Sequence, residues 1–307
     1  MTSAPLPSFP VSKLLVCAAE GAASDHALRA AARLAEQCGA RVDLLHVVEP
    51  ILVPGGHFPS LGGGDLSQRN AENVKARLRA HLALEHESLR LEGQRPADKL
   101  EVVLGSPAQV VLERAKNYDL VFLGASGHRK QLDFGGVARA LFARCDTPLW
   151  LQVDAPAKLE RILVPVDLSP KSFELLHRAV ALARLVGAQL TALHCFVAPD
   201  IFAGADAAAP IPSPTYTIDS LRAAERREFE VALAAFDWRG VAHEALFGDD
   251  DPARRILAMQ DRFDLIVLGT HGHSALLAAV LGSVAWRVLR MAHTGVLLVR
   301  TPGGYAL

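Results

Sequence analysis

The 307-residue sequence lacks any strong excess of charge and has few cysteines. Its 32 Lys and Arg side chains are balanced by 33 Asp and Glu side chains, which leaves a net charge of −1. A chain without a basic excess has no electrostatic footprint for a nucleic acid. The four cysteines form no Cys-x-x-Cys pair, so a disulfide or zinc framework is not expected and a reducing compartment is favoured.

Segments that would carry the chain to a membrane are also missing from the sequence as given. The first ten residues contain no basic residue followed by an apolar core, so no secretion signal is visible. The longest uncharged apolar run, Ser274–Trp286, is interrupted by Gly282 and Ser283 and is too short to span a bilayer. We therefore expect a cytoplasmic protein that has neither a membrane nor a nucleic acid as its partner.

A long internal repeat is present instead. Leu15-Val16 recurs as Leu163-Val164, and Leu45-His46 recurs as Leu193-His194, both 148 positions further on. Other matched segments recur at slightly different offsets, which is typical of a duplicated domain rather than of a solenoid with a short period. The length of the chain also fits two domains of ordinary size.

Within each copy, short apolar runs alternate with amphipathic segments, which predicts an α/β fold. The expected strands cover 13–17, 42–48, 100–104, 120–123, 149–153, 161–164, 190–195, 242–246, 265–268 and 296–300. Five strands alternating with four helices imply a parallel sheet with helices on both faces. We expect the strand order 3-2-1-4-5 in each copy, with a domain boundary near Asp154–Lys158 that divides the chain into 1–156 and 157–307.

Connecting segments are also recognisable. The segments 51–70 and 198–219, rich in small residues and proline, are predicted to be long mobile loops, and 67–91 is predicted to be a charged helix. Ser106-Pro107 and Asp251-Pro252 have the pattern of a helix N-cap followed by proline at the first helical position.

The fourth strand of the second copy is followed by a glycine pattern that suits an anion. Gly269 and Gly272 come directly after the strand, and Gly282-Ser283 opens a helix expected to run to about Ala292. Glycine lets backbone N–H groups approach an anion closely, and a helix N-terminus adds free N–H groups and its dipole. The alternative is that these glycines only make tight turns between strand and helix.

The first strand of the second copy adds a carboxylate at its end. In the expected strand order the first and fourth strands are neighbours, and ligands bind at their carboxyl ends. Asp167 therefore emerges opposite the glycines. Its carboxylate can accept the hydroxyls of a ribose, or it can cap the turn that follows. With both halves in register, we interpret this region as a nucleotide site.

With these residues the sequence resembles a tandem universal stress protein over about residues 11–301. The second copy matches the nucleotide motif of that family, Gly-x2-Gly-x9-Gly-Ser, at the glycines and serine given above. The resemblance implies a Rossmann-like, adenine nucleotide α-hydrolase-like fold in each copy, and ATP as the ligand, with or without Mg²⁺. The site residues that it implies are Pro165, Val166, Asp167, Cys195, Leu268, Gly269, His271, Gly272, Gly282, Ser283 and Val284.

The resemblance assigns these residues to parts of the nucleotide. Val166 and Asp167 would hold the base and the ribose, while Gly272, Gly282, Ser283 and Val284 would hold the phosphates. Cys195 stands beside the adenine, where the family often has valine, and this departure affects the expected affinity for the base.

The first copy departs much further from the motif. Cys17-Ala18-Ala19 stands where the second copy has Pro165-Val166-Asp167, so the ribose carboxylate is missing. Its glycine pattern, Gly124-x2-Gly127-x7-Gly135-Gly136, is two residues short and has glycine in place of the serine. We expect a degenerate domain with a structural or regulatory role. The alternative is a site for another ligand that uses His128, Arg129 and Lys130.

The residues of an efficient enzyme are not evident. The sequence contains no GxxxxGK[ST] P-loop, and the phosphate motif contains no lysine or arginine. His271 and His273 lack a third ligand at a suitable spacing, so no metal site is expected. The resemblance therefore implies a nucleotide-binding switch in a stress response. A slow ATPase and a nucleotide-free interaction module are the alternatives.

The final strands of the two copies, 149–153 and 296–300, carry little charge to protect them as sheet edges. In the family such edges pair between two domains. The resemblance thus implies a pseudo-dimer of the two domains within one chain, and it leaves open a homodimer of the whole chain.

Overall fold

The computed structural model describes residues 11–18, 22–49, 96–124, 136–155, 158–198, 214–270 and 281–300, together with a few residues between 72 and 83. The predicted loop 51–70, most of the predicted helix 67–91 and the segment 199–213 lie outside these residues. Within the described part of the chain, no helix is long and apolar enough to cross a membrane.

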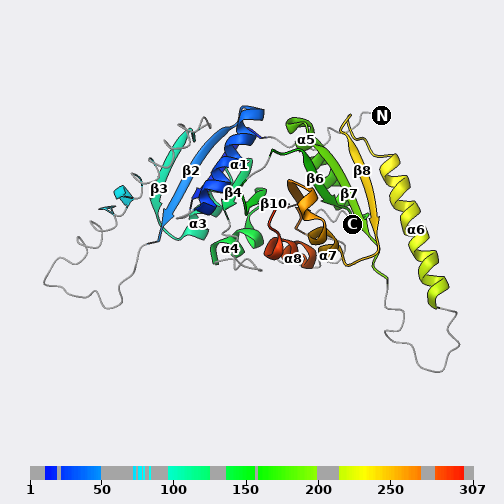
Figure 1. Cartoon of the computed structure of the whole chain (residues 1–307). Helices are drawn as coiled ribbons and strands as arrows, with labels where there is room; N and C mark the ends of the chain where they lie inside the picture. Colours follow the sequence, from blue (N-terminus) through cyan, green and yellow to red (C-terminus); the bar gives the residue numbers. More distant parts are fainter. Residues whose placement is uncertain are drawn as a thin grey trace, which may run out of the picture.

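Strands and helices alternate through the chain (Figure 1). The first half contains β1 Lys13–Ala18, α1 Ala22–Cys38, β2 Arg41–Val48, β3 Lys99–Leu104, α3 Pro107–Ala115, β4 Leu120–Gly124, α4 Gly136–Arg144 and β5 Leu149–Gln152. The second half contains β6 Arg161–Pro165, α5 Pro170–Val186, β7 Gln189–Cys195, α6 Pro214–Ala234, β8 His243–Gly248, α7 Pro252–Ala258, a 3₁₀ helix Gln260–Arg262, β9 Leu265–Gly269, α8 Ser283–Met291 and β10 Gly295–Val299. The alternation confirms the predicted α/β class.

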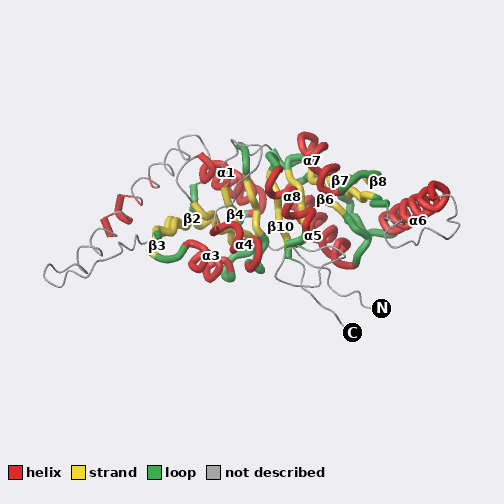
Figure 2. Tube along the Cα trace, turned by 90° about the horizontal axis from the view of Figure 1, so that it is seen from below, coloured by secondary structure: helices red, strands yellow, loops and turns green. Residues whose placement is uncertain are grey.

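All ten strands belong to one sheet, with the order β3-β2-β1-β4-β5-β10-β9-β6-β7-β8. Each half therefore has the predicted order 3-2-1-4-5, and its strands are parallel. β5 and β10 meet as an antiparallel pair in which Trp150 lies opposite Leu297. This is the pairing expected of the two final strands, and it makes the sheet continuous from one half to the other (Figures 1 and 2).

Helices cover both faces of the sheet, because strand side chains alternate between the two faces and make both of them apolar. In β1, Leu14 and Val16 belong to one buried cluster and Leu15 belongs to the other. The first cluster includes buried side chains of α1, α5 and α6, and the second includes those of α3, α4, α7 and α8. This arrangement confirms the predicted helices on both faces.

The helix starts show where local sequence determines structure. Asp251 caps α7 as predicted, because its side chain accepts a hydrogen bond from the backbone N–H of Arg254. Ser106 occupies the N-cap position of α3, but its side chain makes no capping hydrogen bond. The predicted loop 198–219 was too long, since α6 begins at Pro214. Proline is tolerated in the first helical turn, so the prolines of this segment did not show where the loop ends and the helix begins.

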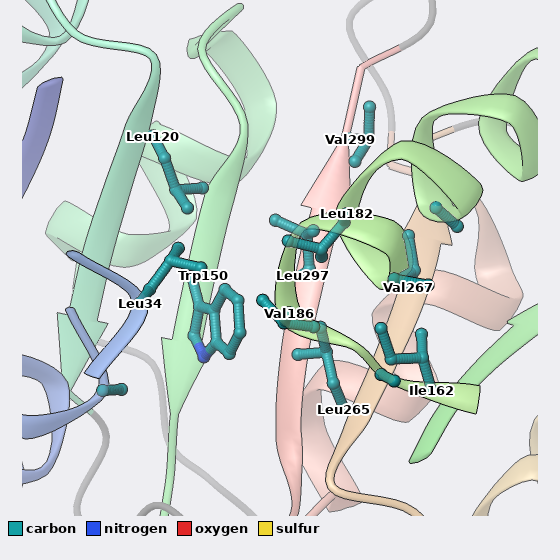
Figure 3. Close-up of a cluster of buried hydrophobic side chains, with 14 of the residues drawn as sticks. Leu34, Leu120, Trp150, Ile162, Leu182, Val186, Leu265, Val267, Leu297 and Val299 are labelled. Atoms are coloured by element: carbon teal, nitrogen blue, oxygen red, sulfur yellow. The ribbon is translucent and has the colours of Figure 1, made fainter. Parts of the chain in front are cut away.

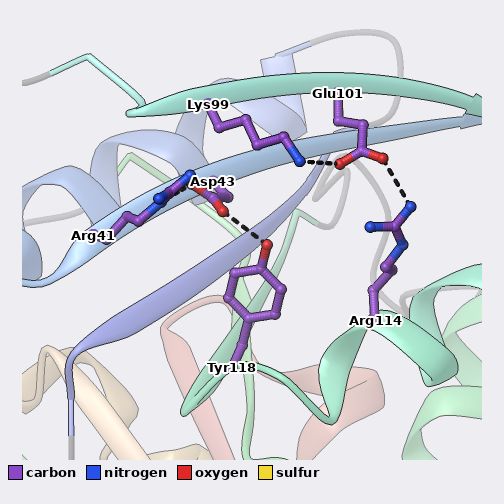
Figure 4. A network of polar contacts seen from close by, with 6 residues as sticks. All are labelled: Arg41, Asp43, Lys99, Glu101, Arg114 and Tyr118. Atoms are coloured by element: carbon purple, nitrogen blue, oxygen red, sulfur yellow. Dashed lines mark hydrogen bonds and ion pairs between the residues drawn. The ribbon is translucent and has the colours of Figure 1, made fainter.

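Two carboxylates of the first half hold its outer strands and α3 together (Figure 4). Asp43 bonds Arg41 through Oδ1 and accepts from the Tyr118 hydroxyl through Oδ2, at 2.7 and 2.8 Å. Glu101 likewise uses both carboxylate oxygens: Oε2 accepts from Lys99 Nζ at 2.7 Å and Oε1 accepts from Arg114 Nη2 at 2.8 Å. Burial and the bond to Asp43 raise the pKa of Tyr118 to about 12. The Tyr118 hydroxyl therefore stays protonated, and it can donate this bond at neutral pH.

Candidate functional site

A cavity of about 590 Å³ lies at the carboxyl ends of β6 and β9 in the second half. Its lining includes every described member of the predicted set: Pro165, Val166, Asp167, Cys195, Leu268, Gly269, Gly282, Ser283 and Val284. His271 and Gly272 lie outside the described residues. The fold thus brings together the ends of β6, β7 and β9 and the start of α8 at one place.

The position of the cavity follows from the sheet topology. β6 pairs with β7 on one side and with β9 on the other, so the chain winds in opposite directions from β6. The connections after β6 and β9 therefore leave on opposite faces of the sheet, and a crevice remains between them. Ligand pockets of proteins usually have volumes of about 300–1,000 Å³, so the cavity is large enough for a small molecule.

Asp167 stands in a tight turn between β6 and α5. Its Oδ1 accepts hydrogen bonds from the backbone N–H and the hydroxyl of Ser169, at 3.1 and 2.5 Å. Leu168 adopts a positive φ of 63°, which reverses the chain direction within the turn. Ser169 then caps α5 by accepting from the N–H of Ser172. Asp167 therefore caps the turn and also lines the cavity, so the two roles considered from sequence are compatible.

The N-terminus of α8 forms the opposite wall. Gly282 is the N-cap residue, and its own N–H donates to the carbonyl of Thr270 at 2.8 Å. The first hydrogen bond of the helix runs from the Trp286 N–H to the Gly282 carbonyl. The amides of Ser283, Val284 and Ala285 precede this bond, and all three residues line the cavity. This wall therefore presents backbone donors and the positive end of a helix dipole.

Charged side chains border the same wall. Lys171 of α5 lines the cavity, as does Asp251. The Asp251 carboxylate accepts from the Arg254 backbone N–H at 2.9 Å and from Arg287 Nη1 at 2.8 Å, which ties the start of α7 to α8. Partial burial acts to raise the pKa of Asp251, but these hydrogen bonds hold the pKa below its usual value. Asp251 therefore stays ionised beside the cavity.

The end of β7 closes the cavity with Cys195 and His194. Burial raises the pKa of the Cys195 thiol to about 11, so this side chain is a neutral, mainly apolar part of the wall at pH 7. His194 is 4% exposed, with Nδ1 2.7 Å from the Val166 carbonyl and Nε2 2.6 Å from Glu225 Oε1 of α6. Because a carbonyl oxygen only accepts, Nδ1 carries a proton, and His194 anchors the strand end that leads to Asp167.

His194 was not predicted to be part of the site. The repeated Leu-His pair was the feature of the sequence that could have indicated this histidine. In the first half, His46 makes the corresponding contact, with its Nδ1 2.9 Å from the Ala18 carbonyl oxygen. Around the corresponding place in that half, the residues 125–135 lie outside the description. Gly136 is the first residue of α4, as Ser283 is of α8.

Comparison with known proteins gives a consistent result for both halves. A universal stress protein of Mycolicibacterium smegmatis is 26% identical over 305 residues, 94% of this chain and 96% of the relative. The universal stress protein YxiE of Bacillus subtilis is 31% identical over 153 residues, 46% of this chain and 98% of the relative. The solved structure of a universal stress protein from Archaeoglobus fulgidus covers 94% of this chain and 98% of its own, with a TM-score of 0.64 and 18% identity, which supports the fold alone.

The sequence model of one family accounts for nearly all of the described chain. It is the model of the universal stress protein family, and it matches residues 10–152 and again residues 158–300. The two matches correspond to the two halves of the ten-stranded sheet. The chain therefore belongs to the universal stress protein family.

Proposed function

We propose that the second domain, 157–307, binds one ATP molecule in the cavity at the ends of β6 and β9. One observation supports this proposal. The described residues of the predicted set come from four separate segments of the chain, and all of them line the same cavity. In the same proposal the first domain, 1–156, is degenerate and serves structure or regulation. The protein would act in the cytoplasm as a nucleotide-dependent switch.

The chemistry of the cavity wall fits the parts of ATP. Val166 and the neutral thiol of Cys195 supply an apolar surface for the adenine, and the Asp167 carboxylate supplies acceptors for ribose hydroxyls. The Gly282-Ser283 end of α8 supplies donors for phosphate oxygens. His271 and Gly272, which lie outside the described residues, complete the proposed set.

Mg²⁺ fits the same arrangement as a partner of the phosphates. The carboxylate of Asp251, which bonds Arg287 of α8, lines the cavity beside the proposed phosphate wall. A divalent cation between the phosphates and this carboxylate would offset the repulsion between like charges, and magnesium prefers oxygen ligands. We propose that the protein binds ATP more tightly with Mg²⁺ present than in EDTA.

Binding stoichiometry tests the proposal directly. Titration calorimetry of the full chain with ATP is expected to show one site per chain, because only the second domain carries the complete set of residues. Two equivalent sites would show that the first domain is not degenerate. Failure to bind ATP, ADP or AMP would contradict the proposal and favour a nucleotide-free interaction module.

We expect ATP to be bound much better than it is hydrolysed. Backbone amides at a helix N-terminus stabilise the ground state of the triphosphate, and uniform binding does not accelerate chemistry. Hydrolysis needs an oriented water and charges matched to the transition state, and an arginine finger alone contributes about 10³–10⁵ in rate. Phosphate release with Mg²⁺ should remain far below about one per second, the lower end of common enzyme turnover. A rate near that value, lost in Gly282→Val, would identify an ATPase and contradict the switch.

A further inference from the structure

The junction between the two domains contains positions that face their own equivalents. Trp150 of β5 lies directly opposite Leu297 of β10, and these two residues occupy the same place in the two sequence copies, 147 positions apart. The pseudo-two-fold axis between the domains therefore passes through this pair. In a pairing of two identical domains, a residue at this place would face its own copy. Here a tryptophan faces a leucine.

The Trp150 side chain has a specific environment at the junction. It is 4% exposed and stacks on Phe122 with the ring centroids 5.1 Å apart. Its Nε1 donates to Gln152 Oε1 at 2.9 Å, so the buried indole N–H has an acceptor. Figure 3 shows the indole in the space between β5 and β10, with Leu297 and Val186 on the other side of that space. The ring of the first domain is thus buried against the second domain.

Gly295 of the second domain leaves the space that this arrangement needs. A Cβ at Gly295 would lie 3.2 Å from Gln152 Oε1 and 3.4 Å from both Trp150 Nε1 and the backbone carbonyl oxygen of Asp264, which is closer than most Cβ contacts. No positive φ requires glycine at this position. Two of these three neighbours, Gln152 and Trp150, belong to the first domain, so the absent side chain leaves room for the contact between the domains and is not required by the backbone conformation.

The reverse arrangement, with a tryptophan at position 297 and a leucine at position 150, would lack both the space for the indole ring and the acceptor for its N–H. By the same offset of 147 positions, the equivalent of Gly295 in the first domain is Pro148, and the equivalent of Gln152 is Val299. A tryptophan at position 297 would consequently meet a proline ring, and its N–H would have no amide oxygen beside it. A buried donor without an acceptor destabilises the folded state. The junction is therefore complementary in one direction only.

A second facing pair repeats this asymmetry on the other side of the sheet. Arg139 of α4 and Trp286 of α8 are also 147 positions apart, and Arg139 Cζ lies 5.9 Å from the centroid of the Trp286 ring. A guanidinium over an indole is an attractive cation–π arrangement. Two arginines facing each other would instead repel.

We propose that β5 and α4 form a docking surface that is specific for the second domain, with Trp150 and Arg139 as the residues that determine its specificity. The surface accepts β10 and α8 through Gly295 and Trp286, and it rejects a second copy of the first domain. The tandem chain therefore closes this edge on itself, and any homodimer of the whole chain must use another surface. This inference is independent of nucleotide binding.

A residue swap in the full chain tests the direction of the fit. The double variant Trp150→Leu with Leu297→Trp keeps the composition and, by pseudo-symmetry, the generic apolar contact. Its thermal unfolding midpoint is expected to fall by at least about 2–4 °C, the shift that corresponds to about 1 kcal/mol in a domain of 150–250 residues. An unchanged midpoint would show that the junction is only a nonspecific apolar contact and would overturn the proposal.

A glycine series keeps the proposal testable if the swapped chain does not fold. Gly295→Ala is expected to lower the midpoint, while Gly248→Ala serves as a matched strand control because a Cβ there would make only ordinary contacts of 3.6 Å or more. In the background of Trp150→Leu, Gly295→Ala should have a smaller effect, because the close approach to the indole is gone and the side chain of Gln152 no longer has to accept from it. Equal effects of the two glycine changes, or equal effects of Gly295→Ala in both backgrounds, would contradict the role of Trp150.

Discussion

A Gly282→Val variant is expected to lose ATP binding while it keeps the fold. Gly282 has φ −59° and ψ 149°, a backbone conformation that any L-residue can adopt, so valine introduces no strain there. The branched side chain would instead occupy the space in front of the α8 amides where the phosphates are proposed to lie. The affinity measured by calorimetry should fall by at least about 100-fold, since several hydrogen bonds of about 1.5–3 kcal/mol to a charged group would be lost.

The first domain offers a control glycine at the start of its own helix, one position after the equivalent of Gly282. Gly136 begins α4, and a Cβ there would meet no atom within 4 Å. Gly136→Val should leave ATP binding unchanged, and both variants should keep the circular dichroism of the wild type. We expect the thermal unfolding midpoint of the Gly282 variant to be lower by about 2–4 °C, because valine is a poorer N-cap residue than glycine. Retained affinity in Gly282→Val, or equal losses in both variants, would place the site elsewhere.

An Asp167→Ala variant is expected to bind ATP about 10- to 150-fold more weakly. Hydrogen bonds from ribose hydroxyls to a carboxylate are worth about 1.5–3 kcal/mol, which corresponds to that range of affinity. Isothermal titration with ATP and with 2′-deoxy-ATP would measure the effect. The deoxynucleotide should bind more weakly than ATP to the wild type, and the difference should shrink in the variant because the ribose partner is absent.

The turn around Asp167 requires a separate control. Asp167 Oδ1 accepts two hydrogen bonds from Ser169, so the alanine change also removes the cap of the turn. Ser169→Ala removes the hydroxyl part of that contact, together with the side-chain cap of α5, and leaves the carboxylate in place. If Ser169→Ala weakens ATP binding as much as Asp167→Ala does, the carboxylate acts through the turn and not through the ribose.

The strands and their order could be predicted from sequence because the signals are local and repeated. Apolar runs ended by glycine or polar residues identify β6 and β9, and the strand order places Asp167 and Gly282 at one cavity. The role of Trp150 could not be predicted, because the space beside Gly295 depends on two strands from different domains. The sequence shows that both residues are present, but it does not show that they lie next to each other in the fold.

Hydrogen bonding was harder to predict than position. Ser106 and Asp251 occupy equivalent cap positions, yet only Asp251 makes the capping bond, which depends on side-chain rotamers and neighbours such as Arg287. The contact between His194 and Glu225 joins a strand to a helix 31 residues later and has no local signal. Both features depend on tertiary structure, which local propensity does not specify.

The antiparallel pairing of β5 with β10 also has a thermodynamic consequence. Side chains of both domains, such as Trp150 and Leu297, belong to one buried cluster, so unfolding of either domain would expose apolar surface of the other to water. The two domains therefore share much of the free energy that keeps each of them folded. A ligand that binds only the folded second domain stabilises that shared unit by mass action. Occupancy of the proposed site is therefore expected to protect backbone amides of the first domain against hydrogen exchange, although the residues that line this cavity all belong to the second domain.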